Sequence, residues 1–182
     1  MLYAYLDGME DHRRGQGRMY DLPGVVMVTV LAVLSDACSC RRVHSFVKTH
    51  FKKLKKLLGL SWKRVPSYTG LRKIVQGISP VEMERLFRSY STDLAGGVSG
   101  NGMFLACDGK SLRGSFDNMQ DKKMVQLLSV FAVHDRVILA HHEIDKKSNE
   151  IPAFQQLVSE LGLTGKVFTL DAMHCQKKPC SL

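Results

Sequence analysis

Residues 103–110 read MFLACDGK, a short apolar run that ends in a carboxylate. Residues 167–171 repeat the pattern as VFTLD. Short apolar runs bounded by turn residues are typical of buried strands. If these two strands are neighbours, Asp108 and Asp171 converge and repel each other, and a divalent cation such as Mg²⁺ is the simplest remedy. The alternative is that each Asp caps a turn, because Asp-Gly is a common turn pair.

The pattern around these runs predicts an α+β or α/β domain in the second half of the chain. Two β-rich runs separated by a short polar turn predict a hairpin, and an amphipathic segment predicts a helix. The expected order is strand, strand, strand, helix, strand, over residues 103–107, 125–133, 137–144, 152–161 and 166–170. We expect this sheet domain to be incomplete, because only 11 residues follow Asp171.

A Gly-rich stretch separates this half from a first half that is predicted to be all helical. Residues 96–102 read GGVSGNG, a Gly-rich segment with too few large side chains to pack into a hydrophobic core. We therefore expect a basic helical domain over residues 1–95, a linker over 96–102 and the sheet domain over 103–182. Apolar periodicity and capping residues predict helices over 25–37, 42–58, 68–76 and 80–94.

The chain is basic, with 26 Lys and Arg against 17 Asp and Glu and a formal net charge of +9. Eleven of the basic residues fall between Arg41 and Lys73, where the sequence has no Asp or Glu. A field of one sign suits a polyanion, with nucleic acid the first candidate, although a solvated helix face is the alternative. The candidate DNA contacts are Lys48, Lys52, Lys53, Lys55, Lys56, Lys63, Arg64, Arg72 and Lys73.

Composition and cysteine usage narrow the class of protein. With 45% hydrophobic and 24% charged residues the chain is of ordinary globular composition, which excludes wholesale disorder and a coiled coil. Its five scattered cysteines form no disulfide framework and indicate a reduced, cytosolic protein. The apolar run over residues 22–34 is shorter than the roughly 20 residues needed to span a bilayer, so it predicts a buried helix and no membrane partner.

Three ordered motifs extend this interpretation. They read LACDGKSLRGS over residues 105–115, KSNEIPA over 147–153 and TLDAMHCQ over 169–176. Together they resemble the signatures of insertion-sequence transposases of the H-repeat-associated type, which belong to the DDE superfamily. The segments 11–22 and 66–72 resemble the helical domain that precedes the catalytic domain in that family, so the resemblance covers nearly the whole chain.

The resemblance implies a ribonuclease-H-like catalytic fold with an Asp, Asp, Glu site that binds Mg²⁺ or Mn²⁺ and cuts and joins DNA. Asp108 matches the first acid and Asp171 the second, 63 residues later. Lys110 and Arg113 follow the first acid, where they are suited to hold a scissile phosphate or to lie in solvent as loop charges.

The third acid of the family is expected downstream of residue 182. We therefore expect a truncated transposase that is catalytically inactive by itself, with a non-catalytic DNA-binding or inhibitory fragment as the alternative. The implied partners are transposon ends in DNA and either a second copy of the chain or an intact transposase. The implied location is the bacterial cytoplasm, at the nucleoid when DNA is bound.

Overall fold

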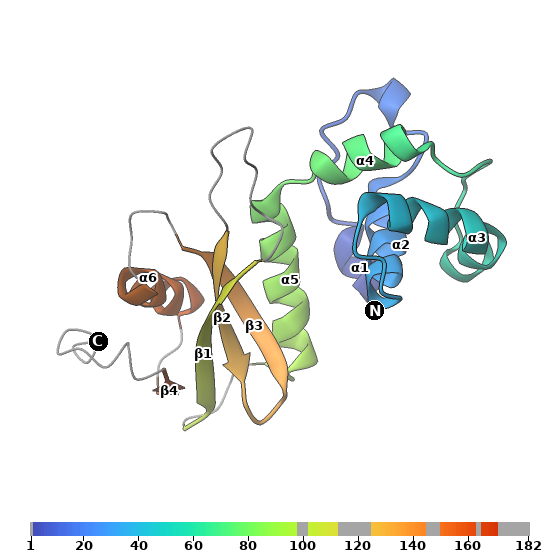
Figure 1. Cartoon of the computed structure of the whole chain (residues 1–182). Coiled ribbons are helices and arrows are strands. Elements are labelled where there is room, and N and C mark those ends of the chain that lie inside the picture. Colours follow the sequence, from blue (N-terminus) through green and yellow to red (C-terminus); the bar gives the residue numbers. More distant parts are fainter. Residues whose placement is uncertain (1, 98–101, 113–124, 145–149, 163–164, 171–182) are drawn as a thin grey trace. The chain divides into compact units, whose positions relative to one another are not determined.

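The computed structural model describes residues 2–97, 102–112, 125–144, 150–162 and 165–170. The chain divides into two units, which we call the first unit (Met1–Leu86) and the second unit (Phe87–Leu182). In the described residues, helices fill the first unit and a four-stranded mixed sheet forms the second (Figure 1). This arrangement agrees with the predicted α+β class.

The helices predicted over 68–76 and 80–94 have these bounds, whereas those predicted over 42–58 and 25–37 begin two and three residues earlier, and the latter ends at Leu34. Ser67 accepts a hydrogen bond from the Gly70 N–H at 3.1 Å, and Ser79 accepts one from the Glu82 N–H at 3.3 Å, so both serines cap the following helix. Gly59 ends the long basic helix with a φ of 65°, a left-handed conformation that glycine adopts without strain. The helices are α1 (Leu2–Leu6), α2 (Leu22–Leu34), α3 (Cys40–Leu58), α4 (Tyr68–Gln76) and α5 (Pro80–Leu94), with a short 3-10 helix at Gly15–Gly17. Neither α1 nor the 3-10 helix was predicted.

Helix α2 is the central helix of the first unit, as its apolar sequence predicted. Val25 and Val28 are fully buried and pack with Trp62 and other core residues. At the end of the helix, however, Val33 and Leu34 are 57% and 79% exposed, so the prediction of burial on most sides is wrong for the last turn. The segment 15–34 is apolar enough for a membrane span by composition, but α2 itself has 13 residues and lies in this core.

The carboxylate of Asp21 joins three parts of the first unit. It caps α2 by accepting the Gly24 N–H at 2.8 Å, and it accepts the indole N–H of Trp62 at 2.6 Å and the hydroxyl of Tyr3 at 3.1 Å. Trp62 is 1% exposed, so its indole nitrogen depends on this acceptor. Burial, with the nearby charge of Asp21, raises the pKa of Tyr3 to about 12. The Tyr3 hydroxyl therefore stays protonated and able to donate well above neutral pH.

The sheet of the second unit has the strand order β3-β2-β1-β4. Its strands are β1 (Phe104–Ser111), β2 (Gln126–Ala132), β3 (Val137–Glu143) and β4 (Val167–Thr169). β2 pairs antiparallel with both β1 and β3, whereas β4 pairs parallel with β1. With α6 (Glu150–Leu161) between β3 and β4, this is the order of elements that the sequence predicted.

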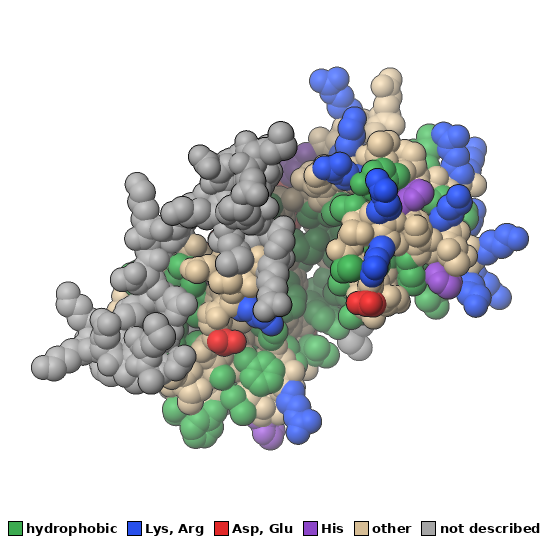
Figure 2. Space-filling view, viewed as in Figure 1, with side chains coloured by type: hydrophobic (Ala, Val, Ile, Leu, Met, Phe, Trp, Pro, Cys, Tyr) green, Lys and Arg blue, Asp and Glu red, His purple; other side chains and the backbone are tan. Residues whose placement is uncertain are grey.

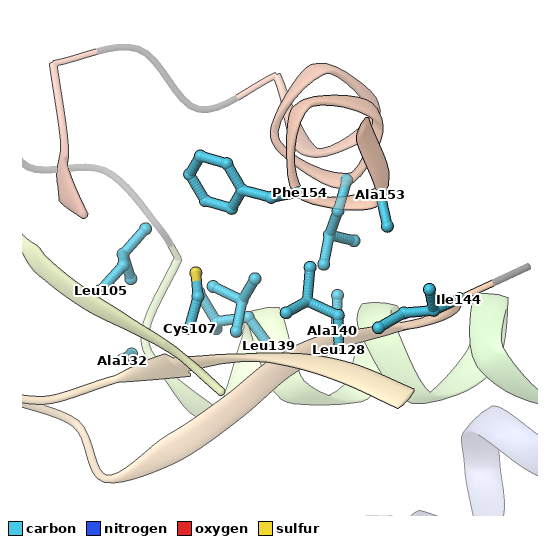
Figure 3. Packing of buried hydrophobic residues seen from close by; sticks show 11 residues of the cluster. Leu105, Cys107, Leu128, Ala132, Leu139, Ala140, Ile144, Ala153 and Phe154 are labelled. Carbon is cyan, nitrogen blue, oxygen red and sulfur yellow. The ribbon is translucent and has the colours of Figure 1, made fainter. Parts of the chain in front are cut away.

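Helix α6 covers one face of the sheet. Phe154 and Leu157 of the helix are buried with Leu105 and Cys107 of β1 (Figure 3). Phe154 also meets Phe168 of β4 edge to face, with ring centroids 5.4 Å apart. The hydrophobic core of the second unit therefore lies between the sheet and α6, and it fixes which way the side chains of β1 point.

The two units divide inside α5 rather than at the Gly-rich stretch. The division falls between Leu86 and Phe87. Phe87 stacks against His141 of β3 at 4.9 Å between ring centroids, and Arg88 donates to the His141 carbonyl at 2.9 Å and to Glu160 at 3.1 Å. The last turns of α5 thus belong with the sheet. The domain boundary predicted at the linker over residues 96–102 is not tested, because residues 98–101 lie outside the described ranges.

Replacing Asp21 by Ala is expected to destabilise the first unit by about 3 kcal/mol, because it removes a helix cap and leaves the buried Trp62 N–H without an acceptor. Trp62 is the single tryptophan of the chain, so its fluorescence during urea unfolding reports on this unit. Tyr3→Phe is the control, since it removes one partner of the same carboxylate and should cost about 1 kcal/mol. Equal losses for the two variants would contradict this role of Asp21.

Candidate functional site

Asp108 lies on β1 and points away from the hydrophobic core. Leu105 and Cys107 are 0% and 6% exposed and pack beneath α6, whereas Asp108 is exposed. Successive side chains of a strand point to opposite faces, so Asp108 lies on the face of the sheet opposite α6. Burial raises the pKa of the Cys107 thiol to about 12, which keeps this neighbour of the acid neutral and inside the core.

β1 and β4 are parallel neighbours with a constant offset of 63 residues. The pairs are Phe104 with Val167, Leu105 with Phe168 and Ala106 with Thr169. The Thr169 hydroxyl donates to the Leu105 carbonyl at 3.4 Å, which adds a side-chain bond to this pairing. The same 63 residues separate Asp108 from Asp171. The predicted neighbouring strands are thus found, but Asp171 lies outside the described residues and its meeting with Asp108 stays a prediction.

Two polar residues that the motifs did not single out share a row with Asp108. Ser129 of β2 pairs with Asp108, and His141 of β3 pairs with Ser129. Directly paired residues of antiparallel strands point to the same face, so these three side chains lie side by side across the sheet. A register shift between Val130 and Phe131 contributes to this alignment, and nothing in the sequence marks where such an irregularity falls.

The described part of this site is not a complete metal site. Among the described residues, no group of three or more His, Cys, Asp and Glu side chains is placed to hold an ion. Lys110 is exposed two residues after Asp108 on the same strand, and therefore on the same face. Arg113, the other predicted phosphate contact, lies outside the described ranges. Asp108 provides a carboxylate that can bind a hard metal ion. Lys110 provides a positive charge beside it that can bind an anionic substrate.

The predicted DNA contacts on α3 are exposed. The helix buries Val43, Val47 and Leu54, which leaves its lysines on the outer faces, and Figure 2 shows Lys and Arg side chains gathered over the first unit. The exposed lysines of α3 are Lys48, Lys52, Lys53, Lys55 and Lys56. Lys55 differs from the others, because its ammonium donates to the Trp62 carbonyl at 2.7 Å and so supports the turn after the helix.

Two of the other predicted contacts line a pocket that the sequence did not reveal. Lys63, Arg64, Arg72 and Lys73 are all exposed. Arg64 and Lys73 line a pocket of about 690 Å³, and Lys63 and Arg64 line a neighbouring one of about 470 Å³. The larger pocket is built from residues 13–20 and 64–74, which are distant in the sequence, so no local pattern indicates it.

Comparisons with known proteins identify relatives for nearly the whole chain. A family model described as DDE_Tnp_1-associated matches residues 3–91. "Putative protein YbfL" of Escherichia coli K12 is 31% identical over 176 residues, which cover 97% of this chain and 46% of that protein. "H repeat-associated putative transposase YhhI" of the same organism is 29% identical with the same two coverages.

A third relative is matched over more of its own length. "Putative transposase YncI" of Escherichia coli K12 is 30% identical over 177 residues, which cover 97% of this chain and 70% of that protein. The chain spans about half the length of the first two relatives. No solved structure matches the chain.

The burial of Cys107 predicts a difference in thiol reactivity. Because the thiolate is the reactive form, iodoacetamide at pH 8 should alkylate Cys107 at least ~10-fold more slowly than the exposed Cys38 in the native chain. Mass spectrometry of the digested peptides measures both rates, and unfolding in urea should make them similar. Equal rates in the native chain would show that β1 does not turn Cys107 into the core and Asp108 away from it.

Proposed function

The chain belongs to the family of DDE-type insertion-sequence transposases, and we propose that it carries the first two acids of a site that cuts and joins DNA. The parallel pairing of β1 with β4 supports this proposal most directly. If the pairing continues for two more residues, its 63-residue offset would set Asp108 beside Asp171. Directly paired residues of parallel strands share one face, so the two carboxylates would lie together on the face opposite α6.

The ligand chemistry of these residues fits Mg²⁺ or Mn²⁺, which prefer carboxylate and water oxygens. Asp108 is exposed and strand-mounted, so it is accessible and held on a rigid element. The chemistry that a bound ion would supply at these residues is polarisation of the scissile phosphate and activation of the attacking oxygen. Asp108 and Asp171 would hold the ion, while Lys110 and Arg113 bind the nonbridging phosphate oxygens and orient the phosphodiester for in-line attack.

Two carboxylates leave the ligand shell of the ion incomplete. We propose that the third acid of the family completes it in an intact transposase, within a ribonuclease-H-like domain whose first part is this sheet. On this proposal the 182 residues by themselves do not cleave DNA. Robust metal-dependent nicking by the purified chain, abolished by Asp108→Ala, would contradict the proposal.

Metal binding tests the pairing of the two acids. Asp108→Asn and Asp171→Asn are each expected to weaken Mn²⁺ binding by on the order of 10-fold or more, because each variant removes one of two anionic ligands. Electron paramagnetic resonance of free Mn²⁺ during a titration measures the affinity. Asp36→Asn, which removes an exposed carboxylate of the first unit, is the matched control and should bind like the parent chain. Unchanged binding in either site variant would refute a shared ion.

A non-catalytic DNA-binding or inhibitory fragment is the second candidate function. The observation that favours it is the acid-free basic stretch between Arg41 and Lys73, which carries exposed cations. Lys and Arg can bind DNA phosphates without a metal ion. Such a fragment would bind transposon ends at the bacterial nucleoid and pair with a second copy or with an intact transposase. Binding to DNA with EDTA present distinguishes this function from metal-dependent catalysis.

The salt dependence of DNA binding tests the α3 face. Lys52→Gln combined with Lys56→Gln is expected to make the negative slope of log affinity against log salt shallower by about 2, because each lost phosphate contact removes about 0.9 from its magnitude. Fluorescence anisotropy with a labelled duplex measures the slope. Arg85→Gln removes a positive charge from an exposed site outside the acid-free stretch and should leave the slope unchanged. The same change per charge at both places would assign the effect to net charge alone.

A further inference from the structure

We propose that the 690 Å³ pocket of the first unit binds one unpaired nucleotide of DNA, with the base inside and its phosphate held at the rim. This site rests on the DNA binding proposed above and adds a preference for an unpaired end over a duplex. All of its lining residues belong to the first unit, so the pocket is complete within one unit.

The interior of the pocket suits a flat, largely apolar ring. Met19, Tyr20, Val65 and Ile74 line it. Tyr20 is held in place by an edge-to-face contact with the buried Trp62, at 5.2 Å between ring centroids. Bases stack on aromatic and apolar side chains with little regard to sequence. At about 690 Å³ the pocket also falls within the usual size range of small-ligand sites.

The rim of the pocket favours an anion. Arg64 and Lys73 are exposed cations at its wall, and no Asp or Glu lines it. The smaller neighbouring pocket shares Arg64 and Met19 with the larger one and is also lined by Lys63. Lys63 would therefore be placed to bind the phosphate of the adjacent nucleotide. A third pocket of about 210 Å³ shares Arg13 and Lys73 with the larger one but is also lined by Glu10, Asp11 and Glu82, so it favours an anion less.

A third cation, Arg13, is held rigidly in the wall of the pocket. Arg13 also lines the pocket, and Asp11 accepts hydrogen bonds from its Nε at 2.8 Å and its Nη2 at 2.6 Å. These bonds lower the pKa of the Asp11 carboxyl, so this partner stays ionised and holds the guanidinium in place. The Nη2 of Arg13 also donates to the Tyr20 carbonyl at 2.8 Å, which fixes Arg13 beside Tyr20 in the wall of the pocket.

The chemistry of the pocket selects an unpaired nucleotide over a duplex. In a duplex the bases are stacked and paired, so only the backbone reaches a concave apolar surface. Extrusion of a base from a duplex costs unpairing and unstacking energy, which an unpaired end does not require. A pocket with an apolar interior and a basic rim therefore gains most from single-stranded DNA.

Two glycines of the 3-10 helix provide a matched test that leaves the charge unchanged. Gly17 lines the pocket, and a Cβ built there meets only Arg13 Cβ, at an ordinary 3.7 Å. Gly15 does not line the pocket, and a Cβ there meets nothing within 4 Å. Gly17→Leu therefore adds bulk at the wall of the pocket, whereas Gly15→Leu adds the same side chain two residues away.

The experiment measures the affinity of the full chain for a blunt duplex and for the same duplex with an unpaired 3′ extension. We expect the parent chain and Gly15→Leu to prefer the extension, and Gly17→Leu to lose on the order of 10-fold on the extended DNA only. Arg64→Gln and Lys73→Gln should also weaken binding to the extension, which provides a test that does not depend on the glycine variants folding.

Each other outcome overturns a different statement. If Gly17→Leu binds both DNAs like the parent chain, the pocket is not a nucleotide site although DNA binding stands. If it weakens both DNAs equally, the pocket receives the backbone of a duplex and the unpaired nucleotide is excluded. If the parent chain binds neither DNA, the proposed function fails together with the site.

Discussion

The parallel pairing of β1 with β4 is the constraint on which the proposed chemistry depends. In this pairing a residue of β1 lies beside the residue 63 positions later in the chain. The packing of Leu105 and Cys107 beneath α6 determines which face each side chain of β1 occupies, because the alternation of a strand leaves no choice once one face is buried. Core packing therefore determines the face on which Asp108 lies, and the proposed partner Asp171 depends on this strand pairing continuing for two more residues.

The first unit depends on a different interaction, the carboxylate of Asp21 at the start of α2. It ties Trp62 into the core, and Trp62 in turn holds Tyr20 and accepts the Lys55 ammonium at its carbonyl. The basic surface of α3 and the pocket beside Tyr20 therefore share one structural support. Each unit has its own hydrophobic core, so the proposed DNA contact and the proposed metal site lie on separately packed parts of the chain.

Much of the fold followed from local sequence signals, because those signals act over a few residues. Ser67 and Ser79 each cap a helix through the backbone three residues later, so the helix starts were readable. The hydrogen bond between Asp21 and Trp62 spans 41 residues, and the pocket joins segments as far apart. The hydrophobic periodicity of the sequence does not indicate contacts between residues so far apart. The row of Ser129 and His141 beside Asp108 was equally hidden, because the register of a hairpin depends on an irregularity between Val130 and Phe131.

Nuclear magnetic resonance of the isotopically labelled chain tests the central claim most directly, through proton contacts between the backbones of β1 and the residues that follow β4. If the two acids share an ion, residues 107–108 should contact residues 170–171 and so continue the offset of 63 found for the three pairs before them. A different offset, or contacts that end at Thr169 while Asp171 turns away from Asp108, would contradict a shared metal site.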